Sequence, residues 1–207
     1  MRGGDTIINL EYSSFDELRT ELLGCTRCGL CSGRTNVVVG VGNPKARVML
    51  IGEAPGEQED LRGEAFVGRS GQLMDKMLGY VGLSRKSNIY ITNMLKCRPP
   101  QNRDPSKEEL ALCMNYLQKQ IELINPQVII CIGRISATAI IAPDYKVTQQ
   151  HGTFLERDGR LYMGTFHPAA LLRNPNNKPA AMEDLLGLRK KLLELGIYTE
   201  EQLAFVP

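Results

Sequence analysis

The sequence predicts an α/β fold, a three-layer α/β/α sandwich around a mostly parallel central sheet. Short apolar runs alternate with amphipathic segments along the chain, and the runs at 46–52 and 126–133 have continuous apolar cores. Strands that are apolar on both faces are typical of parallel sheets covered by helices on both sides. No repeat, low-complexity tract or long linker divides the chain, so we expect a single domain over residues 1–207.

Helices are predicted from end signals and apolar periodicity. Residues 13–24 form an amphipathic segment with Ser13 or Ser14 at the N-cap and Gly24 at the end. Ser106 opens the segment 106–124 with Glu109 three residues later, which is the pattern of a capping box. Further helices are predicted at 68–83, 135–142 and 181–196.

Strands are predicted where short apolar or β-branched runs end in turn residues. They are expected within 46–52, 88–95 and 126–133. Residues 152–166 read as a hairpin, with Asp-Gly at 158–159 as its turn.

Three unusual segments follow predicted strands: GEAPG at 52–56, NMLKCRPP at 93–100 and FHPAALLRNP at 166–175. Ligands of open α/β sheets bind beyond the carboxyl ends of the strands, so these segments predict a site. Glu53 could act there as a base or polarise water. Asn93 and His167 are the polar candidates at the other two ends, although each residue taken alone more often has a structural role.

Composition narrows the functional classes. The sequence has no apolar stretch long enough for a membrane-spanning helix and no signal-peptide pattern at its N-terminus, so we expect a cytoplasmic protein. The net charge of +2 neither requires nor excludes nucleic acid. In a reducing compartment, clustered cysteines indicate metal binding or catalysis before disulfides.

Three cysteines lie within the segment CTRCGLC at 25–31, and Cys97, Cys113 and Cys131 follow far downstream. A close pair with two distant cysteines suits either a four-cysteine zinc site or an iron–sulfur cluster, and spacing alone does not separate them. Cys31 also allows a ferredoxin-like run. Cys131 lies between apolar residues and is expected to be a core thiol.

Four motifs in order resemble the thermostable, iron–sulfur family 4 uracil-DNA glycosylases: GEAPGEQED, EAFVGRSGQL, ITNMLKCRPP and FHPAALLRNP. The resemblance runs from about residue 25 to residue 195. It implies a uracil-DNA glycosylase-like fold and removal of uracil from DNA in base excision repair. It also implies a 4Fe–4S cluster with a structural role and four ligands: Cys25, Cys28, Cys97 and Cys113.

The resemblance assigns roles to the strand-end residues. Phe66 would stack on the flipped uracil, Asn93 would read its edge, and His167 would donate to O2. Glu53 would position or polarise water, although other uracil glycosylase families carry Asp at the position of Ala54. The remaining residues expected to bind the base are Gly52, Ala54, Gly56 and Glu59, of which Glu59 would exclude the methyl group of thymine.

The segment 166–175 is also expected to face DNA. Leu171 or Leu172 would enter the gap left by the flipped base, and Arg173 would hold phosphates, although both leucines could equally be core residues. The loop after Phe66 lacks the basic, histidine-containing insertion of relatives that become trapped on DNA, so ordinary turnover is expected.

The expected partner is uracil-containing DNA, single- or double-stranded. The protein is expected to act as a monomer near the nucleoid, without membrane contact and with a sliding clamp as a candidate partner. The alternatives are a non-catalytic zinc protein that binds nucleic acid, an electron carrier, and a different α/β hydrolase. The last lacks the G-x-S-x-G motif of a nucleophile elbow.

Overall fold

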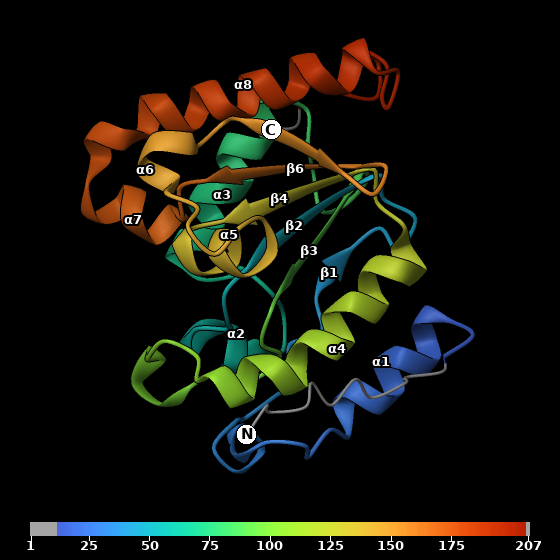
Figure 1. Cartoon of the computed structure of the whole chain (residues 1–207), viewed down its shortest axis with the longest axis vertical. Helices are drawn as coiled ribbons and strands as arrows, with labels where there is room; N and C mark the ends of the chain where they lie inside the picture. Colours follow the sequence, from blue (N-terminus) through green and yellow to red (C-terminus); the bar gives the residue numbers. More distant parts are fainter. Residues whose placement is uncertain (1–11, 206–207) are drawn as a thin grey trace.

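The computed structural model describes residues 12–205, in which a six-stranded sheet has the order β1-β3-β2-β4-β6-β5 (Figure 1). The inner strands β3, β2, β4 and β6 are parallel, and the edge strands β1 and β5 are antiparallel to their neighbours. The strands are β1 (Val41–Gly42), β2 (Val48–Gly52), β3 (Ile89–Asn93), β4 (Val128–Ile132), β5 (Phe154–Arg157) and β6 (Arg160–Thr165).

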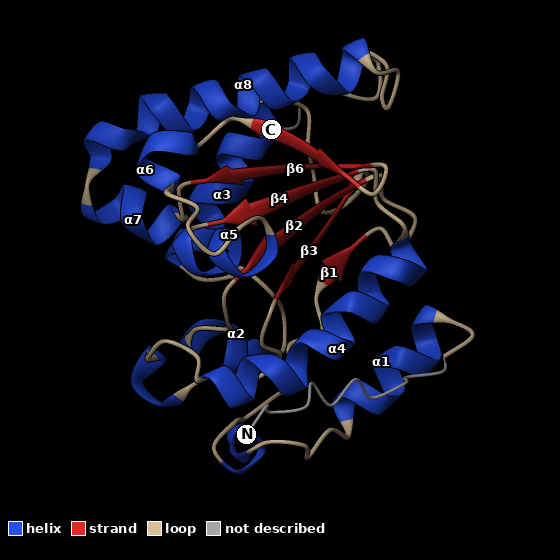
Figure 2. Ribbon diagram, viewed as in Figure 1, coloured by secondary structure: helices blue, strands red, loops and turns tan. Residues whose placement is uncertain are grey.

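Helices cover both faces of this sheet, and the strands form the middle layer between them (Figure 2). The helices are α1 (Phe15–Leu23), α2 (Glu57–Arg62), α3 (Arg69–Tyr80), α4 (Lys107–Ile124), α5 (Arg134–Ile140), α6 (Val147–Gln150), α7 (Pro168–Arg173) and α8 (Lys178–Glu194). The predicted α/β/α sandwich is therefore confirmed. No helix in the described part of the chain is long and apolar enough to cross a membrane.

Alternate residues of each inner strand serve different layers. In β2, Val48 and Leu50 pack with α3 and α8, whereas Met49 and Ile51 pack with α4 and α5. The same division holds in β4, where every residue is buried. This two-sided burial explains why the strand sequences are continuously apolar rather than alternating.

The predicted end signals are confirmed in the helices and the hairpin. The Ser14 hydroxyl accepts from the backbone N–H of Glu17 at the start of α1, and Gly24 follows its end. Ser106 and Glu109 form the capping box of α4. Asp158 and Gly159 both have positive φ, 51° and 71°, as a two-residue type I′ turn requires.

The short helices α2, α6 and α7 were not predicted. Each has six residues or fewer, which is too short for a helical period to show in the sequence. Helix α7 lies inside the segment 166–175, with His167 as its N-cap and Pro168 at its first position. A proline there is well placed, because the first helical N–H has no acceptor within the helix.

A third apolar cluster lies away from the sheet, between α1, the 3-10 turn at Gly29–Ser32 and the outer face of α4. Leu18, Leu22, Leu30 and Tyr116 form its centre, and Cys97 is buried with them. This cluster attaches the N-terminal cysteine segment to the rest of the fold.

Candidate active site

The carboxyl ends of the four parallel strands meet at one cleft of about 610 Å³. The chain leaves β2 toward β3 on one side and β4 toward β6 on the other, so the ends of β2 and β4 form a topological switch point. The structure brings these predicted residues together in the cleft wall: Glu53, Ala54, Gly56, Glu59, Phe66, Asn93, His167 and Arg173.

Asn93 ends β3 with its side chain buried at the base of the cleft. The residue is 2% exposed, and its Oδ1 has no hydrogen-bond partner within the described residues. An acceptor left unpaired in a protein interior costs about 1–3 kcal/mol. A ligand that donates a hydrogen bond here would remove that cost, so this atom makes the cleft a candidate binding site.

Gly52 allows an aromatic ring to approach Asn93. A Cβ atom at Gly52 would overlap both Asn93 Oδ1 and the ring of Phe66. Phe66 is itself 6% exposed and has a φ of 54°, which is unusual for a residue other than glycine. Such a conformation costs on the order of 1–3 kcal/mol and persists only where neighbours hold it.

Three residues hold Phe66 in this conformation. Arg85 donates to the carbonyl oxygens of Ala65 and Phe66 and is anchored by Asp75, 2.9 Å from its Nη2. Gly71 leaves room for the Phe66 carbonyl, which a Cβ atom would overlap. The contribution of Arg85 was missed, because nothing in its local sequence indicates a distant carbonyl partner.

Glu59 lies in the cleft wall and fixes the loop that follows Phe66. Its Oε1 accepts from the backbone N–H groups of Val67 at 2.9 Å and Gly68 at 2.8 Å. The carboxylate therefore orders the start of α3 as well as lining the cleft.

His167 lies across the cleft from Phe66, with ring centroids 6.1 Å apart. Its Nδ1 accepts from the backbone N–H of Ala169 at 3.1 Å, which places the proton of the neutral ring on Nε2. Burial, together with the charge of Arg173, lowers the pKa of His167 to about 4. The ring is therefore a neutral donor at physiological pH.

Glu53 follows β2 and faces an ion pair that the sequence did not reveal. Burial raises the pKa of Glu53, the Asp104 carboxylate raises it further, and Arg134 opposes both. Arg134 Nη2 lies 3.3 Å from Asp104 Oδ2. Arg134 comes two residues after the end of β4. Ligands bind beyond the ends of parallel strands, so the same reasoning that selected Glu53, Asn93 and His167 would also have selected Arg134.

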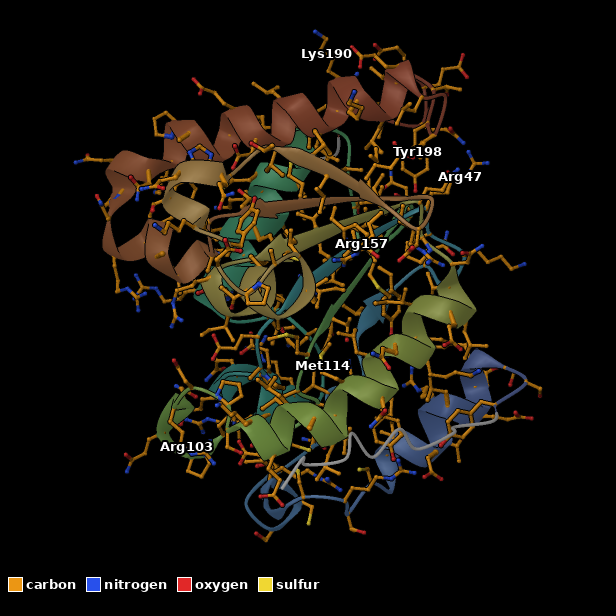
Figure 3. All side chains as sticks on the ribbon, in the orientation of Figure 1. Arg47, Arg103, Met114, Arg157, Lys190 and Tyr198 are labelled. Atoms are coloured by element: carbon orange, nitrogen blue, oxygen red, sulfur yellow. The ribbon has the colours of Figure 1, made fainter. Side chains whose placement is uncertain are left out.

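The loop between β3 and α4 carries Asp104 and closes one side of the cleft. Gln101 and Asn102 both have a φ of 54°. Arg103, labelled in Figure 3, pairs with Glu109 through two contacts of 2.6 and 2.8 Å, and these lower the pKa of Glu109 to about 2. The pair with Arg103 therefore joins this loop to the capping box of α4, and Cys97 lies at the other end of the loop.

The two candidate wedge residues on α7 differ in burial. Leu171 is 1% exposed and packs in the core, so its predicted role as a DNA wedge is corrected. On a six-residue helix, the face toward the core could not be distinguished from sequence. Leu172 is half-buried and Arg173 is exposed at the rim of the cleft.

The cysteines of the predicted cluster line one small cavity, and all are free thiols. Cys25, Cys28, Cys97 and Cys113 share this cavity with Cys31, whereas Cys131 is fully buried in β4 among apolar residues. Burial raises the pKa of the Cys113 thiol to about 11, so a thiolate there needs positive charge nearby. Within residues 12–205, no three His, Cys, Asp or Glu side chains converge as ligands of a single metal ion.

Lys96 lies between the cysteine cavity and Asn93. It is 1% exposed, and its Nζ donates to Asn93 O at 2.6 Å, Thr92 Oγ1 at 2.8 Å and Gln120 Oε1 at 2.6 Å. Burial lowers its pKa to about 8, against the influence of Cys113 and Cys97.

Comparison with known proteins identifies relatives over most of the chain. The uracil DNA glycosylase superfamily matches residues 39–186. A type-4 uracil-DNA glycosylase of Archaeoglobus fulgidus is 41% identical over 194 residues, covering 88% of this chain and 93% of the relative. A Thermotoga maritima type-4 enzyme is 44% identical over 156 residues, covering 74% and 81%. A Sulfurisphaera tokodaii type-4 enzyme is 38% identical over 195 residues, covering 89% and 86%.

Proposed function

Because the chain belongs to the type-4 uracil-DNA glycosylases of the uracil DNA glycosylase superfamily, we propose that it flips uracil out of DNA and hydrolyses its N-glycosidic bond, leaving an abasic site. The chain is thus a hydrolase of DNA repair. The observation that carries the proposal is the unpaired Oδ1 of Asn93 beside the Phe66 ring.

Asn93 supplies the base specificity. Its side-chain amide offers one acceptor and one donor group, which match the N3–H and O4 of uracil. Cytosine presents the reversed pattern, an unprotonated N3 and an amino group, and so leaves both amide groups mismatched. Phe66 provides the face on which the flipped ring stacks.

His167 supplies the main stabilisation of the leaving group. Bond cleavage leaves negative charge on the uracil and positive charge on the sugar. The neutral His167 ring donates through Nε2–H to O2, where the negative charge grows. The hydrogen bond that His167 Nδ1 accepts from the backbone of Ala169 holds the ring in place. The ring therefore needs little reorganisation as the charge on uracil develops.

Glu53 is the residue that we assign to the water and the cationic sugar. It lines the cleft beside Ala54, which has no polar side chain to share this work. Of the neighbouring ion pair, Asp104 raises the pKa of Glu53 and Arg134 lowers it.

Glu59 and α7 complete the substrate contacts. Glu59 excludes thymine, because it lines the cleft where the methyl group would lie. It also holds the neighbouring backbone at Val67 and Gly68 in place. Leu172 is the wedge that fills the gap in the stack, and Arg173 contacts phosphate.

A 4Fe–4S cluster is the cofactor that we assign to Cys25, Cys28, Cys97 and Cys113. Four thiols in one largely apolar cavity are the donor set of such a cluster. The missing single-ion site does not conflict with it, because each thiolate of a cluster binds a different iron atom. When bound, the cluster would cross-link the N-terminal segment to the loop after β3, and it takes no part in bond cleavage.

The activity is tested with a uracil-containing oligonucleotide, single- or double-stranded, followed by alkali cleavage of the abasic site. We expect a single cut at the uracil and none in a matched oligonucleotide that carries thymine. Uncut uracil DNA with folded, iron-loaded protein would contradict the proposal. A non-catalytic zinc protein is not favoured, because the relatives that match most of the chain are glycosylases.

A further inference from the structure

Two cations, the half-buried Arg34 and the buried Lys96, line the cysteine cavity without a carboxylate partner among the described residues. Arg34 Nη1 donates to Cys25 O at 2.6 Å and to Cys97 Sγ at 3.3 Å. In the described part of the chain, Arg34 makes no ion pair with Asp or Glu. The Cys97 sulfur that accepts from Arg34 carries negative charge only as a thiolate, the form in which cysteine binds a metal.

Lys96 is the second cation, and its surroundings are more restrictive. Its three hydrogen-bond acceptors are all neutral oxygens, and water does not reach it. No carboxylate within residues 12–205 pairs with it. Cys113 and Cys97 line the same cavity as Lys96, and their sulfurs carry negative charge only as thiolates, the form in which cysteine binds a metal.

Burying a cation without a counter-charge is costly, so the buried Lys96 and the half-buried Arg34 beside the same thiols indicate that a negative group belongs there. A 4Fe–4S core with four thiolate ligands is a dianion, as is a zinc ion with four thiolates. Two cations therefore match the charge of the occupied cavity, and they would repel each other in an empty one.

We propose that Arg34 and Lys96 are the counter-cations of the dianionic 4Fe–4S centre, and that donation from Arg34 to the Cys97 sulfur raises the reduction potential of the cluster. A positive charge or a donor near the sulfurs favours the more negative, reduced form of a cluster. The inference rests on the cofactor part of the proposed function and names the residues of this chain that would tune it.

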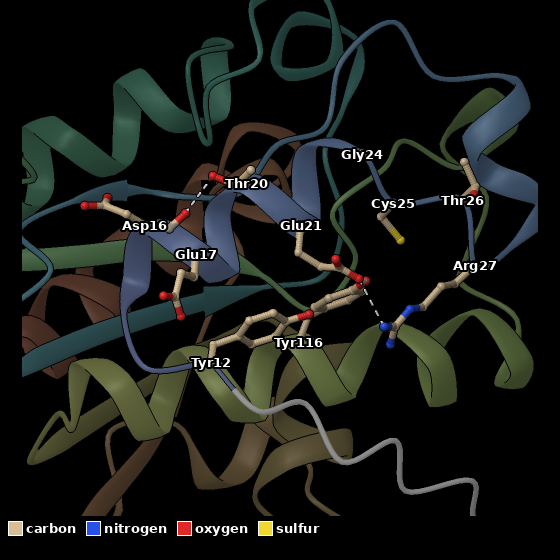
Figure 4. Close-up of a pocket in the computed structure, with 10 residues that line it drawn as sticks. All are labelled: Tyr12, Asp16, Glu17, Thr20, Glu21, Gly24, Cys25, Thr26, Arg27 and Tyr116. Carbon is tan, nitrogen blue, oxygen red and sulfur yellow. Dashed lines mark hydrogen bonds and ion pairs between the residues drawn. The ribbon is translucent and has the colours of Figure 1, made fainter.

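Arg27 provides a matched control on the same cavity. It lines the cavity too, but its Nη2 pairs with Glu21 Oε1 at 3.2 Å and its guanidinium lies 4.7 Å from the Tyr116 ring centroid. Figure 4 shows Arg27 reaching Glu21 in the surface groove beside α1. Its charge is paired with the Glu21 carboxylate, so it should influence the centre less than Arg34, which has no carboxylate partner in the described residues.

The experiment compares wild type with Arg34→Gln, Arg34→Lys, Lys96→Met and Arg27→Gln, each purified without oxygen and loaded with iron. The reduction potential is measured by EPR-monitored titration, and the rate of iron release is measured with a chelator. We expect lower potentials and several-fold faster release for Arg34→Gln and Lys96→Met. The potential and release rate of Arg34→Lys should lie between those of these two variants and wild type. Both quantities in Arg27→Gln should match wild type.

Each outcome decides the question. Failure of Arg34→Gln to retain iron, with retention by Arg27→Gln, supports the inference. Equal potentials and equal release rates in all five proteins would overturn it and leave the glycosylase activity untouched. A wild-type protein that binds no iron would overturn it together with the cofactor proposal, whereas uracil excision is measured independently.

Discussion

At the scale of single residues, the proposed site depends on two polar atoms: an acceptor that has no partner within the described residues and a ring donor whose other nitrogen is already hydrogen-bonded. Asn93 Oδ1 has no partner in the described structure, and His167 uses Nδ1 as an acceptor, which leaves Nε2–H for a ligand. Both residues end elements of the fold, one at the end of β3 and the other at the start of α7. Their positions are therefore set by the backbone rather than by flexible side chains.

Replacing Asn93 by Asp should change which base is chosen. The carboxylate removes the donor to uracil O4 and puts an acceptor there, which suits the amino group of cytosine. Uracil excision should fall, and weak cytosine excision should appear on matched oligonucleotides. Asn115→Asp, on the exposed side of α4, is the control. Unchanged uracil excision and selectivity in Asn93→Asp would misplace the base-reading residue.

Replacing His167 by Ala should slow the chemistry more than it weakens binding. The lost donor acts on charge that develops only in the transition state, so kcat should fall by about 100- to 1000-fold with little change in KM. The control is His151→Ala. His151 is hydrogen-bonded to Asp184, and neither residue lines the cleft. Full turnover by His167→Ala would refute the assignment.

The low pKa of His167 also predicts a pH dependence of stability. The folded protein binds this proton at about pH 4, whereas the unfolded chain binds it near the ordinary value of 6.5. The stability gained from the neutral ring is present above pH 6.5 and is lost as the pH falls toward 4. Urea unfolding at pH 7 and pH 5 should show a smaller loss for His167→Asn, which keeps an N-cap acceptor. An equal loss in both proteins would show that His167 is not the group responsible.

At the scale of elements, the segment between α2 and α3 stores strain to present the Phe66 ring. Glu59 on α2, Arg85 beyond α3 and Gly71 within α3 all act on this one turn. The turn therefore depends on contacts from three places in the sequence.

A pair of glycine-to-alanine changes tests this dependence. Gly71→Ala should lower the free energy of unfolding by about 1–3 kcal/mol and raise KM, because the new methyl group displaces the Phe66 carbonyl. Gly187→Ala, on exposed α8 with open space around it, should instead raise stability by about 0.5–1 kcal/mol and leave KM unchanged. Both effects are measured by urea unfolding and steady-state kinetics. If Gly71→Ala kept the wild-type KM, the conformation of the Phe66 turn would not contribute to substrate binding.

At the scale of the whole molecule, the cysteine cavity joins parts of the chain that the sheet does not connect. Cys25 and Cys28 follow α1, Cys97 follows β3, and Cys113 lies on α4. A centre bound there would hold the N-terminal segment and the loop beside the cleft in one unit.

The protein purified without oxygen should therefore be brown and contain about four iron atoms per chain. Changing Cys25, Cys28, Cys97 or Cys113 to Ser should remove the colour and lower the melting temperature. Cys131→Ala and Cys31→Ser should keep the iron. Cys31 is the more demanding control because it lines the same cavity. A colourless native protein with one zinc would disprove the iron–sulfur assignment.

The sequence by itself determined the layers of the fold, because continuous apolar strands, capping residues and the Asp-Gly turn act through local chemistry. It also predicted which segments line the candidate cleft, because parallel strands end at one edge and unusual segments follow three of them. The ring of Phe66 over Gly52, the proton position on His167, the burial of Leu171 and the unpaired cations Arg34 and Lys96 were decided only by the tertiary structure. Each of these depends on contacts between residues far apart in the chain, and such contacts leave no signal in the local sequence.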